Sequence, residues 1–190
     1  MRFFTFNEMK AYAESEASRF NISMESYFNE SLKQQNLKNN FDIFLSHSSK
    51  DKTLILGIKK FIEESGYTVY IDWVDDPQLD RAHVNVTTAN VLRTRMKQSK
   101  FLIYVDSNNA TTSKWMPWEL GYFDGYKPNK IGILPVRYNS EGTYTGQEYL
   151  ELYPKIEKNS LNALYELKYS EINGKSFRTY FSNGSGVSLI

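Results

Sequence analysis

The stretch FDIFLSHSSKDKTLILGIKKFIEESGYTVYID, residues 41–72, carries the pattern that decides the fold. Residues 41–46 form a short, nearly continuous apolar run that ends in serine, as expected of a strand buried in a parallel sheet. Residues 51–65 gather leucine, isoleucine and phenylalanine on one helical face and lysine and glutamate on the other, and Gly66 follows at the usual position of a helix end. Residues 67–72 predict a second strand.

The same alternation continues along the chain. Residues 100–105 and 130–136 predict further strands and residues 163–169 a fifth one, while the segments around Leu92 and over residues 114–126 predict helices. Strands that alternate with helices of this size form a parallel sheet with helices on both faces. The sequence therefore predicts an α/β fold whose central sheet has about five strands.

The chain divides into three parts by composition. Residues 1–40 are largely polar with apolar positions at helical spacing, and they predict a helical appendage of two short helices with a packing or oligomerisation role. Residues 41–172 contain the strand and helix alternation and form the main domain. Residues 173–190 are rich in glycine and serine, and we expect a tail.

Composition excludes several classes of function. Lys and Arg number 23 against 22 Asp and Glu, so neither nucleic acid nor an acidic membrane is an expected partner. The chain has no cysteine and two histidines, His47 and His83, which leaves no thiolate nucleophile and argues against a metal site. The first ten residues do not resemble a signal peptide, and no apolar run approaches the roughly 20 residues that cross a bilayer. We expect a cytoplasmic protein.

In an open parallel sheet, ligands bind at the carboxyl ends of the strands. The segments at those ends are SHSSKDK from Ser46, DWVDDPQLDR from Asp72 and DSNNATTSKW from Asp106. The first lacks the acidic pair with which a receiver domain holds Mg²⁺, and no glycine-rich phosphate loop or G-x-S-x-G elbow occurs. These absences disfavour receiver or flavin-binding domains, hydride transfer and P-loop hydrolysis.

One carboxylate, Glu119, stands among aromatic residues in the segment SKWMPWELGYFDGY, residues 113–126. Ser113 can cap this helix, but the third residue after it is methionine, so capping does not explain Glu119. Trp115 lies four residues before Glu119 and shares its helix face. An indole beside a carboxylate suits a cationic aromatic ligand. The alternative is that Trp115 is an ordinary core residue.

Several motifs in order give the chain a resemblance to a family. The segments FDIFLSHSSKDK, YTVYIDW, DDPQLDR, LRTRMKQSKFLIYVDS and SKWMPWELGYFDGYK resemble those of bacterial TIR (Toll/interleukin-1 receptor) domains, over about half of the chain. The chain is most like the ThsB-type TIR component of Thoeris antiphage defence. The resemblance implies a flavodoxin-like TIR fold for residues 41–172. It also implies that Trp115 and Glu119 form a WxxxE signature, in which the glutamate catalyses cleavage of NAD⁺.

The chemistry of NAD⁺ explains why one acid suffices. Most glycosidases need a second carboxyl group to protonate the leaving oxygen. Nicotinamide is already cationic and leaves as a neutral molecule, so one fixed anion can stabilise the ribosyl cation that remains. The resemblance implies further residues lining the NAD⁺ site, namely Ser46, His47, Trp73, Arg81, Ser107, Asn108 and Trp115. Each also has an ordinary structural reading as a turn residue, a loop ion pair or a strand-end side chain.

The resemblance also implies partners. We expect the long segment of residues 74–86 to mediate self-association, which a phage-derived trigger could promote, and a separate effector to read an ADP-ribose-derived product, cyclic or conjugated. One alternative is a toxin that only depletes NAD⁺. Another is a non-catalytic scaffold that recruits other TIR domains. Replacement of Glu119 by glutamine separates catalysis from scaffolding, because it removes the charge and leaves the surface intact.

Overall fold

The computed structural model describes residues 2–34, 40–76, 78–79 and 83–156. Each predicted strand from 41 to 136 is present, and so is each predicted helix. The elements are β1 Phe4–Thr5, α1 Phe6–Arg19, α2 Met24–Gln34, β2 Phe41–Ser46, the 3₁₀ turn η1 Ser49–Asp51, α3 Lys52–Glu64, β3 Val69–Tyr70, α4 Asp72–Asp75, α5 Val86–Gln98, β4 Ser99–Asp106, η2 Ala110–Thr112, α6 Trp115–Tyr126, β5 Ile131–Arg137 and η3 Glu148–Leu152.

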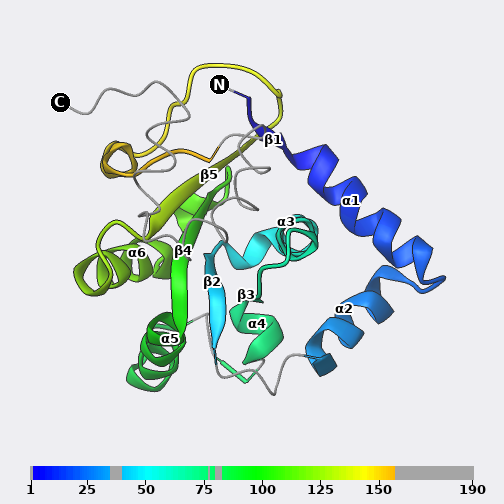
Figure 1. The fold of residues 1–190 in the computed structure, drawn as a ribbon, viewed down its shortest axis with the longest axis horizontal. Helices are drawn as coiled ribbons and strands as arrows, with labels where there is room; N and C mark the ends of the chain where they lie inside the picture. Colours follow the sequence, from blue (N-terminus) through cyan, green and yellow to red (C-terminus); the bar gives the residue numbers. More distant parts are fainter. Residues whose placement is uncertain (1, 35–39, 77, 80–82, 157–190) are drawn as a thin grey trace.

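The five strands form a parallel sheet in the order β1-β5-β4-β2-β3 (Figure 1). Strand β2 lies between two neighbours: Phe44 lies opposite Tyr70 of β3 on one side and Leu102 of β4 on the other. The chain leaves β2 towards β3, then crosses over α5 to β4 on the opposite side. This reversal between β2 and β4 is the point at which parallel sheets bind ligands.

The fifth strand of the described sheet comes from the N-terminal segment, for which we predicted helices only. Residues 163–169 lie outside the described residues, but Phe4–Thr5 at the N-terminus pairs in parallel with Val136 and Arg137 and forms an edge of the sheet. Thr5 then caps helix α1 by accepting a hydrogen bond from the Glu8 amide at 3.2 Å. A strand of two residues carries no periodic pattern, so the sequence did not reveal it.

Each central strand is buried on both faces, because its alternate side chains enter two separate apolar clusters. Helices α1 and α3 cover one face and α5 and α6 cover the other (Figure 1). The first cluster includes Ile43, Leu45, Phe101, Ile103, Leu134 and Val136 from the sheet. The second includes Phe44, Leu102, Tyr104, Ile131 and Ile133. This two-sided burial explains the continuous apolar runs in the sequence.

Helix α1 packs closely on α3, so the N-terminal segment does more than append helices to the domain. Phe4 and Met9 are 1% exposed and belong to the first cluster. At the crossing, a Cβ atom built on Gly57 would lie 2.0 Å from the Met9 carbonyl oxygen. Only glycine allows this approach of one helix backbone to the other.

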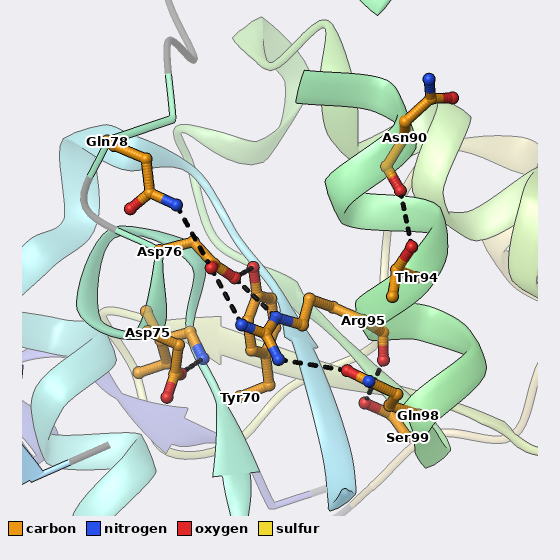
Figure 2. Close-up of polar contacts among 10 residues, drawn as sticks. Tyr70, Asp75, Asp76, Gln78, Asn90, Thr94, Arg95, Gln98 and Ser99 are labelled. Atoms are coloured by element: carbon orange, nitrogen blue, oxygen red, sulfur yellow. Dashed lines mark hydrogen bonds and ion pairs between the residues drawn. The ribbon is translucent and has the colours of Figure 1, made fainter. Parts of the chain in front are cut away.

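A partly buried ion pair ties the segment after β3 to helix α5 (Figure 2). The Asp76 carboxylate accepts hydrogen bonds from Arg95 Nε at 2.7 Å, Arg95 Nη2 at 2.9 Å and the Tyr70 hydroxyl at 2.9 Å. Burial raises the pKa of Asp76, but the hydrogen bonds from Arg95 and Tyr70 outweigh it and hold the pKa below its ordinary value. Asp76 is therefore ionised at neutral pH.

The neighbouring Asp75 behaves differently. It is 3% exposed and accepts the Ile71 amide at 2.7 Å. Burial raises the pKa of Asp75 to about 7, against the opposing effects of the Ile71 amide and the Lys59 charge, and the nearby Asp76 charge adds to the rise. The native state therefore takes up a proton on Asp75 at a pH where the unfolded chain has released it.

We predict that Gly57→Ala lowers the free energy of unfolding by about 1–3 kcal/mol, because the methyl group forces α1 away from α3. Urea denaturation followed by circular dichroism measures this. Gly125→Ala is the matched control: a Cβ there meets nothing within 4 Å, so stability stays constant or rises by up to about 1 kcal/mol. Equal effects of the two changes would show that α1 does not pack against Gly57.

We predict that Asp75→Asn becomes progressively more stable than the wild type as pH rises from about 4 to 8. The pKa of Asp75 is raised on folding, so its contribution to stability is full below the unfolded pKa of about 3.9 and is lost as pH rises through about 7. The difference in unfolding free energy should grow by up to roughly 4 kcal/mol. Urea denaturation at several pH values measures it, with the exposed Glu148→Gln as control. A difference independent of pH would contradict the raised pKa.

Candidate active site

Helix α6 begins beside the reversal between β2 and β4 and turns a carboxylate towards the sheet. Glu119 is 0% exposed and lies in the second turn of the helix, among Met116, Leu120 and Phe123, which are also buried. The Met116 amide donates to Ser113 Oγ at 3.3 Å, in agreement with the expected role of Ser113 at the helix start. A carboxylate buried in this way needs hydrogen-bond donors.

One donor comes from the end of strand β2. Ser46 Oγ donates to Glu119 Oε2 at 2.6 Å, a short hydrogen bond. Ser46 is 1% exposed. Trp115 lies one turn before Glu119, is 4% exposed, and packs edge-on against Trp118 with ring centroids 5.5 Å apart. The structure thus brings Ser46, Trp115 and Glu119 together.

His47 and Trp73, two other expected site residues, bind each other. Trp73 Nε1 donates to His47 Nε2 at 2.7 Å, and His47 Nδ1 lies 2.7 Å from the Leu45 carbonyl oxygen. The Trp73 bond makes Nε2 the acceptor, which leaves Nδ1 as the ring nitrogen that can donate to the Leu45 carbonyl oxygen. Asp72 Oδ1 is 3.2 Å from the same Nε2, but this longer contact would become an ion pair only with a protonated ring.

Ser107 is also engaged in a contact within the protein. Its hydroxyl donates to Asp51 Oδ2 and the Asn109 side-chain amide donates to Asp51 Oδ1, both at 2.6 Å. Asp51 is 4% exposed and joins the segment after β2 to the segment after β4. Asn108 lines a cavity of about 30 Å³ that also reaches Arg137 of β5. Arg81 lies outside the described residues.

A larger pocket, of about 150 Å³, opens at the reversal of the sheet. One wall is the segment after β2 and the other is the segment that leads into α6. The lining residues are Ser48, Ser49, Lys50, Thr112, Ser113, Lys114 and Trp115. Two lysines, four hydroxyl groups and no acid make this pocket suited to an anion. Of these residues the sequence analysis singled out Trp115 for binding; Lys50 and Lys114 were missed, although both lie in strand-end segments.

Neither a metal centre nor a membrane span is found in the described part of the chain. Within residues 2–34, 40–76, 78–79 and 83–156, no group of three or more histidine, aspartate or glutamate side chains is placed to hold a metal ion. No helix in those same ranges is long and apolar enough to cross a membrane. The described site therefore consists of one buried carboxylate, an indole and a cationic pocket.

Comparison with known proteins identifies relatives of this chain. Residues 43–165 match the family model of the TIR domain. A probable 3′ cyclic ADP-D-ribose synthase, ThsB′, from Bacillus cereus (strain MSX-D12) is 53% identical over 122 residues, which cover 64% of this chain and 63% of that protein. A putative cyclic ADP-D-ribose synthase, TIR2, from Cytobacillus dafuensis is 37% identical over 83 residues, 43% of this chain and 22% of that protein.

The chain spans less than two thirds of the length of either curated relative. Among solved structures, the TIR domain of the Toll-related receptor TRR-2 from Hydra magnipapillata aligns with a TM-score of 0.47 at 15% identity, over 70% of this chain and 99% of that chain. The family model covers well over half of the sequence and includes most of β2 and all of β4 and α6, which carry the site. This chain belongs to the TIR domain family.

Proposed function

We propose that this chain cleaves NAD⁺ between nicotinamide and ribose and transfers the ADP-ribosyl group to form a signal in antiphage defence. The product is a cyclic ADP-ribose or another ADP-ribose conjugate. The observation that carries the proposal is the buried Glu119, bound by Ser46 and next to Trp115. The names of both relatives, as cyclic ADP-D-ribose synthases, support the same reaction.

The site suits this reaction because it supplies one fixed anion. When the bond to nicotinamide breaks, its electron pair moves to the ring nitrogen, and nicotinamide leaves without a proton. The positive charge that remains on the ribose is stabilised by the Glu119 carboxylate, which low-dielectric surroundings make more effective than a carboxylate in water. Trp115 is 4% exposed and belongs to the second cluster, so the nicotinamide or another base can stack on its ring only after a local movement uncovers it.

The cationic pocket supplies a place for the phosphates of the dinucleotide. Lys50 and Lys114 come from opposite walls, and Trp115 lies in the lining one helical turn before Glu119. A diphosphate in this pocket would therefore lie beside the reacting end of NAD⁺. We also propose that five further residues bind NAD⁺, namely His47, Trp73, Arg81, Ser107 and Asn108.

Glu119 has no exposure to solvent in the single chain, so substrate reaches it only after a local movement. This observation supports the proposal that self-association completes the site, under a trigger from infection. Val84 and Val86, in the segment expected to mediate association, are 68% and 74% exposed. Turnover that rises no more steeply than linearly with protein concentration would contradict a role for assembly.

The second candidate is a TIR scaffold without catalysis. The exposure of Val84 and Val86 favours it, because exposed apolar side chains suit a surface that associates with another protein. Depletion of NAD⁺ without a signal is a third outcome of the same chemistry, in which water captures the ribosyl cation.

We predict that Glu119→Gln lowers NAD⁺ cleavage at least about 100-fold, because the amide cannot neutralise the ribosyl cation. Mass spectrometry of small molecules from cells, with and without phage, measures NAD⁺, nicotinamide and new ADP-ribose species. Glu30→Gln, an exposed change on α2, is the control and should behave as the wild type. Intact NAD⁺ in the wild type under every condition, with self-association retained, would favour the scaffold.

We predict that Lys50→Gln and Lys114→Gln each raise the KM for NAD⁺ about 3–10-fold and leave kcat within about twofold. Contacts to the phosphates are equal in the ground state and the transition state, so their loss weakens uniform binding. Steady-state kinetics with purified protein measures both constants. Lys97→Gln, on α5 and outside the pocket lining, is the matched control. Unchanged KM in both pocket variants would place the phosphates elsewhere.

A further inference from the structure

Ser46 and Glu119 meet inside the apolar layer between helix α6 and the sheet. The two residues are 73 positions apart in the chain, and both side chains are buried. Around them the second cluster consists mostly of apolar side chains, among them Phe44, Leu120 and Phe123. A polar pair in this layer takes the place of apolar side chains and so reduces the hydrophobic contribution to stability. Packing therefore does not explain why the pair is there.

The strand geometry fixes the direction of Ser46. Along β2, Leu45 enters the first cluster and Phe44 the second, so Ser46 shares the face of Phe44, which is the face that α6 covers. In the parallel register Ser46 lies opposite Tyr104 of β4, whose side chain belongs to the second cluster as well. The last residue of β2 therefore points at α6 without any special backbone geometry.

We propose that Ser46 is a positioning residue for Glu119: its hydroxyl fixes the orientation of the carboxylate that stabilises the ribosyl cation, and it acts through Glu119 and not on the substrate. This inference rests on the proposed function. It also changes the role expected of Ser46, from lining the NAD⁺ site to holding the acid.

The physical reason lies in the freedom of a glutamate side chain. Its terminal torsion is soft and has no sharp minimum, so packing alone leaves the carboxylate oxygens free to rotate. The 2.6 Å hydrogen bond to Oε2 restricts that rotation. Transition-state stabilisation by a charge depends on such preorganisation, because the anion then has nothing to rearrange when the bond breaks.

Tyr104 lies opposite Ser46 in the sheet and also carries a hydroxyl group, but it is not the residue that positions Glu119. Its hydroxyl is buried, and within the described residues no hydrogen bond joins it to Glu119. Burial is the largest cause that raises the pKa of Tyr104, and the neighbouring Tyr149, Asp106 and Glu119 add to it. Tyr104 thus lies within electrostatic reach of Glu119, but Ser46 is the donor that the structure shows from the sheet.

The test compares hydroxyl variants at position 46 by steady-state kinetics, at protein concentrations where the wild type turns over NAD⁺. Ser46→Ala removes one oxygen atom and should lower kcat about 10–100-fold while KM stays within about twofold. Ser46→Thr restores the donor and should recover kcat to within about threefold. Ser46→Cys retains the volume with a weaker donor and should give an intermediate kcat; it also serves if Ser46→Ala does not fold.

Ser99→Ala is the matched control. Ser99 is 1% exposed and begins β4, at the end of the sheet away from α6's start, and its hydroxyl donates to the Arg95 carbonyl at 2.8 Å. Removing an equally buried hydroxyl group at this site measures how far such a deletion lowers kcat when Glu119 is not involved. Its kcat should equal that of the wild type, and thermal unfolding of all variants is recorded beside the kinetics.

Two results would overturn the positioning role. One is a kcat in Ser46→Ala equal to or above that of the wild type, which would mean that the hydrogen bond is dispensable or restrains the acid. The other is a raised KM with unchanged kcat, which would mean that Ser46 binds substrate directly. A wild-type chain that never turns over NAD⁺ contradicts the proposed function and this inference together, whereas normal turnover by Ser46→Ala contradicts this inference alone.

Discussion

The pairing of β2 with β4, buried on both faces, is the constraint on which the rest of the structure depends. These strands share the longest register in the sheet, from Phe41 opposite Ser99 to Ser46 opposite Tyr104. Because helices cover both faces, the backbone groups of β2 and β4 must be satisfied within the sheet, and the side chains that lead up to the carboxyl ends, residues 43–45 and 101–105, are mostly apolar. At those ends the polar residues begin, and there the chain reverses direction and α6 starts.

Buried acids at this edge are each held by specific donors, and these contacts give the site its shape. Asp51 joins the segments after β2 and β4, and Arg137 Nη2 binds Asp106 Oδ2 at 2.5 Å. A buried carboxylate without a donor would cost several kcal/mol, so these contacts restrict how the loops can move. Glu119 belongs to the same group, with Ser46 as its donor. What distinguishes it is the neighbouring indole and cationic pocket.

The sequence predicted the strands and the longer helices from residue 41 to 136, because most of their periodicities are clear, but it did not predict the short helix α4 at Asp72–Asp75. It also selected Trp115 and Glu119, which share a helix face by their spacing alone. It did not reveal the edge strand at Phe4–Thr5, which is too short to have a period, nor the glycine crossing at Gly57. Among the expected site residues, Ser46 contacts Glu119, whereas His47 binds Trp73 and Ser107 binds Asp51. These partners are distant in sequence, and spacing carries no information about them.

The sequence by itself determined the fold class and the helix that carries the acid, since alternating apolar runs and a shared helix face are local properties of the chain. Tertiary structure alone decided which polar groups meet. The contact of Ser46 with Glu119, separated by 73 positions, and the pocket between Lys50 and Lys114 exist because parallel pairing brings the ends of β2 and β4 to one edge. Hydrogen bonds depend on distances of a few tenths of an ångström, which packing of the whole domain sets.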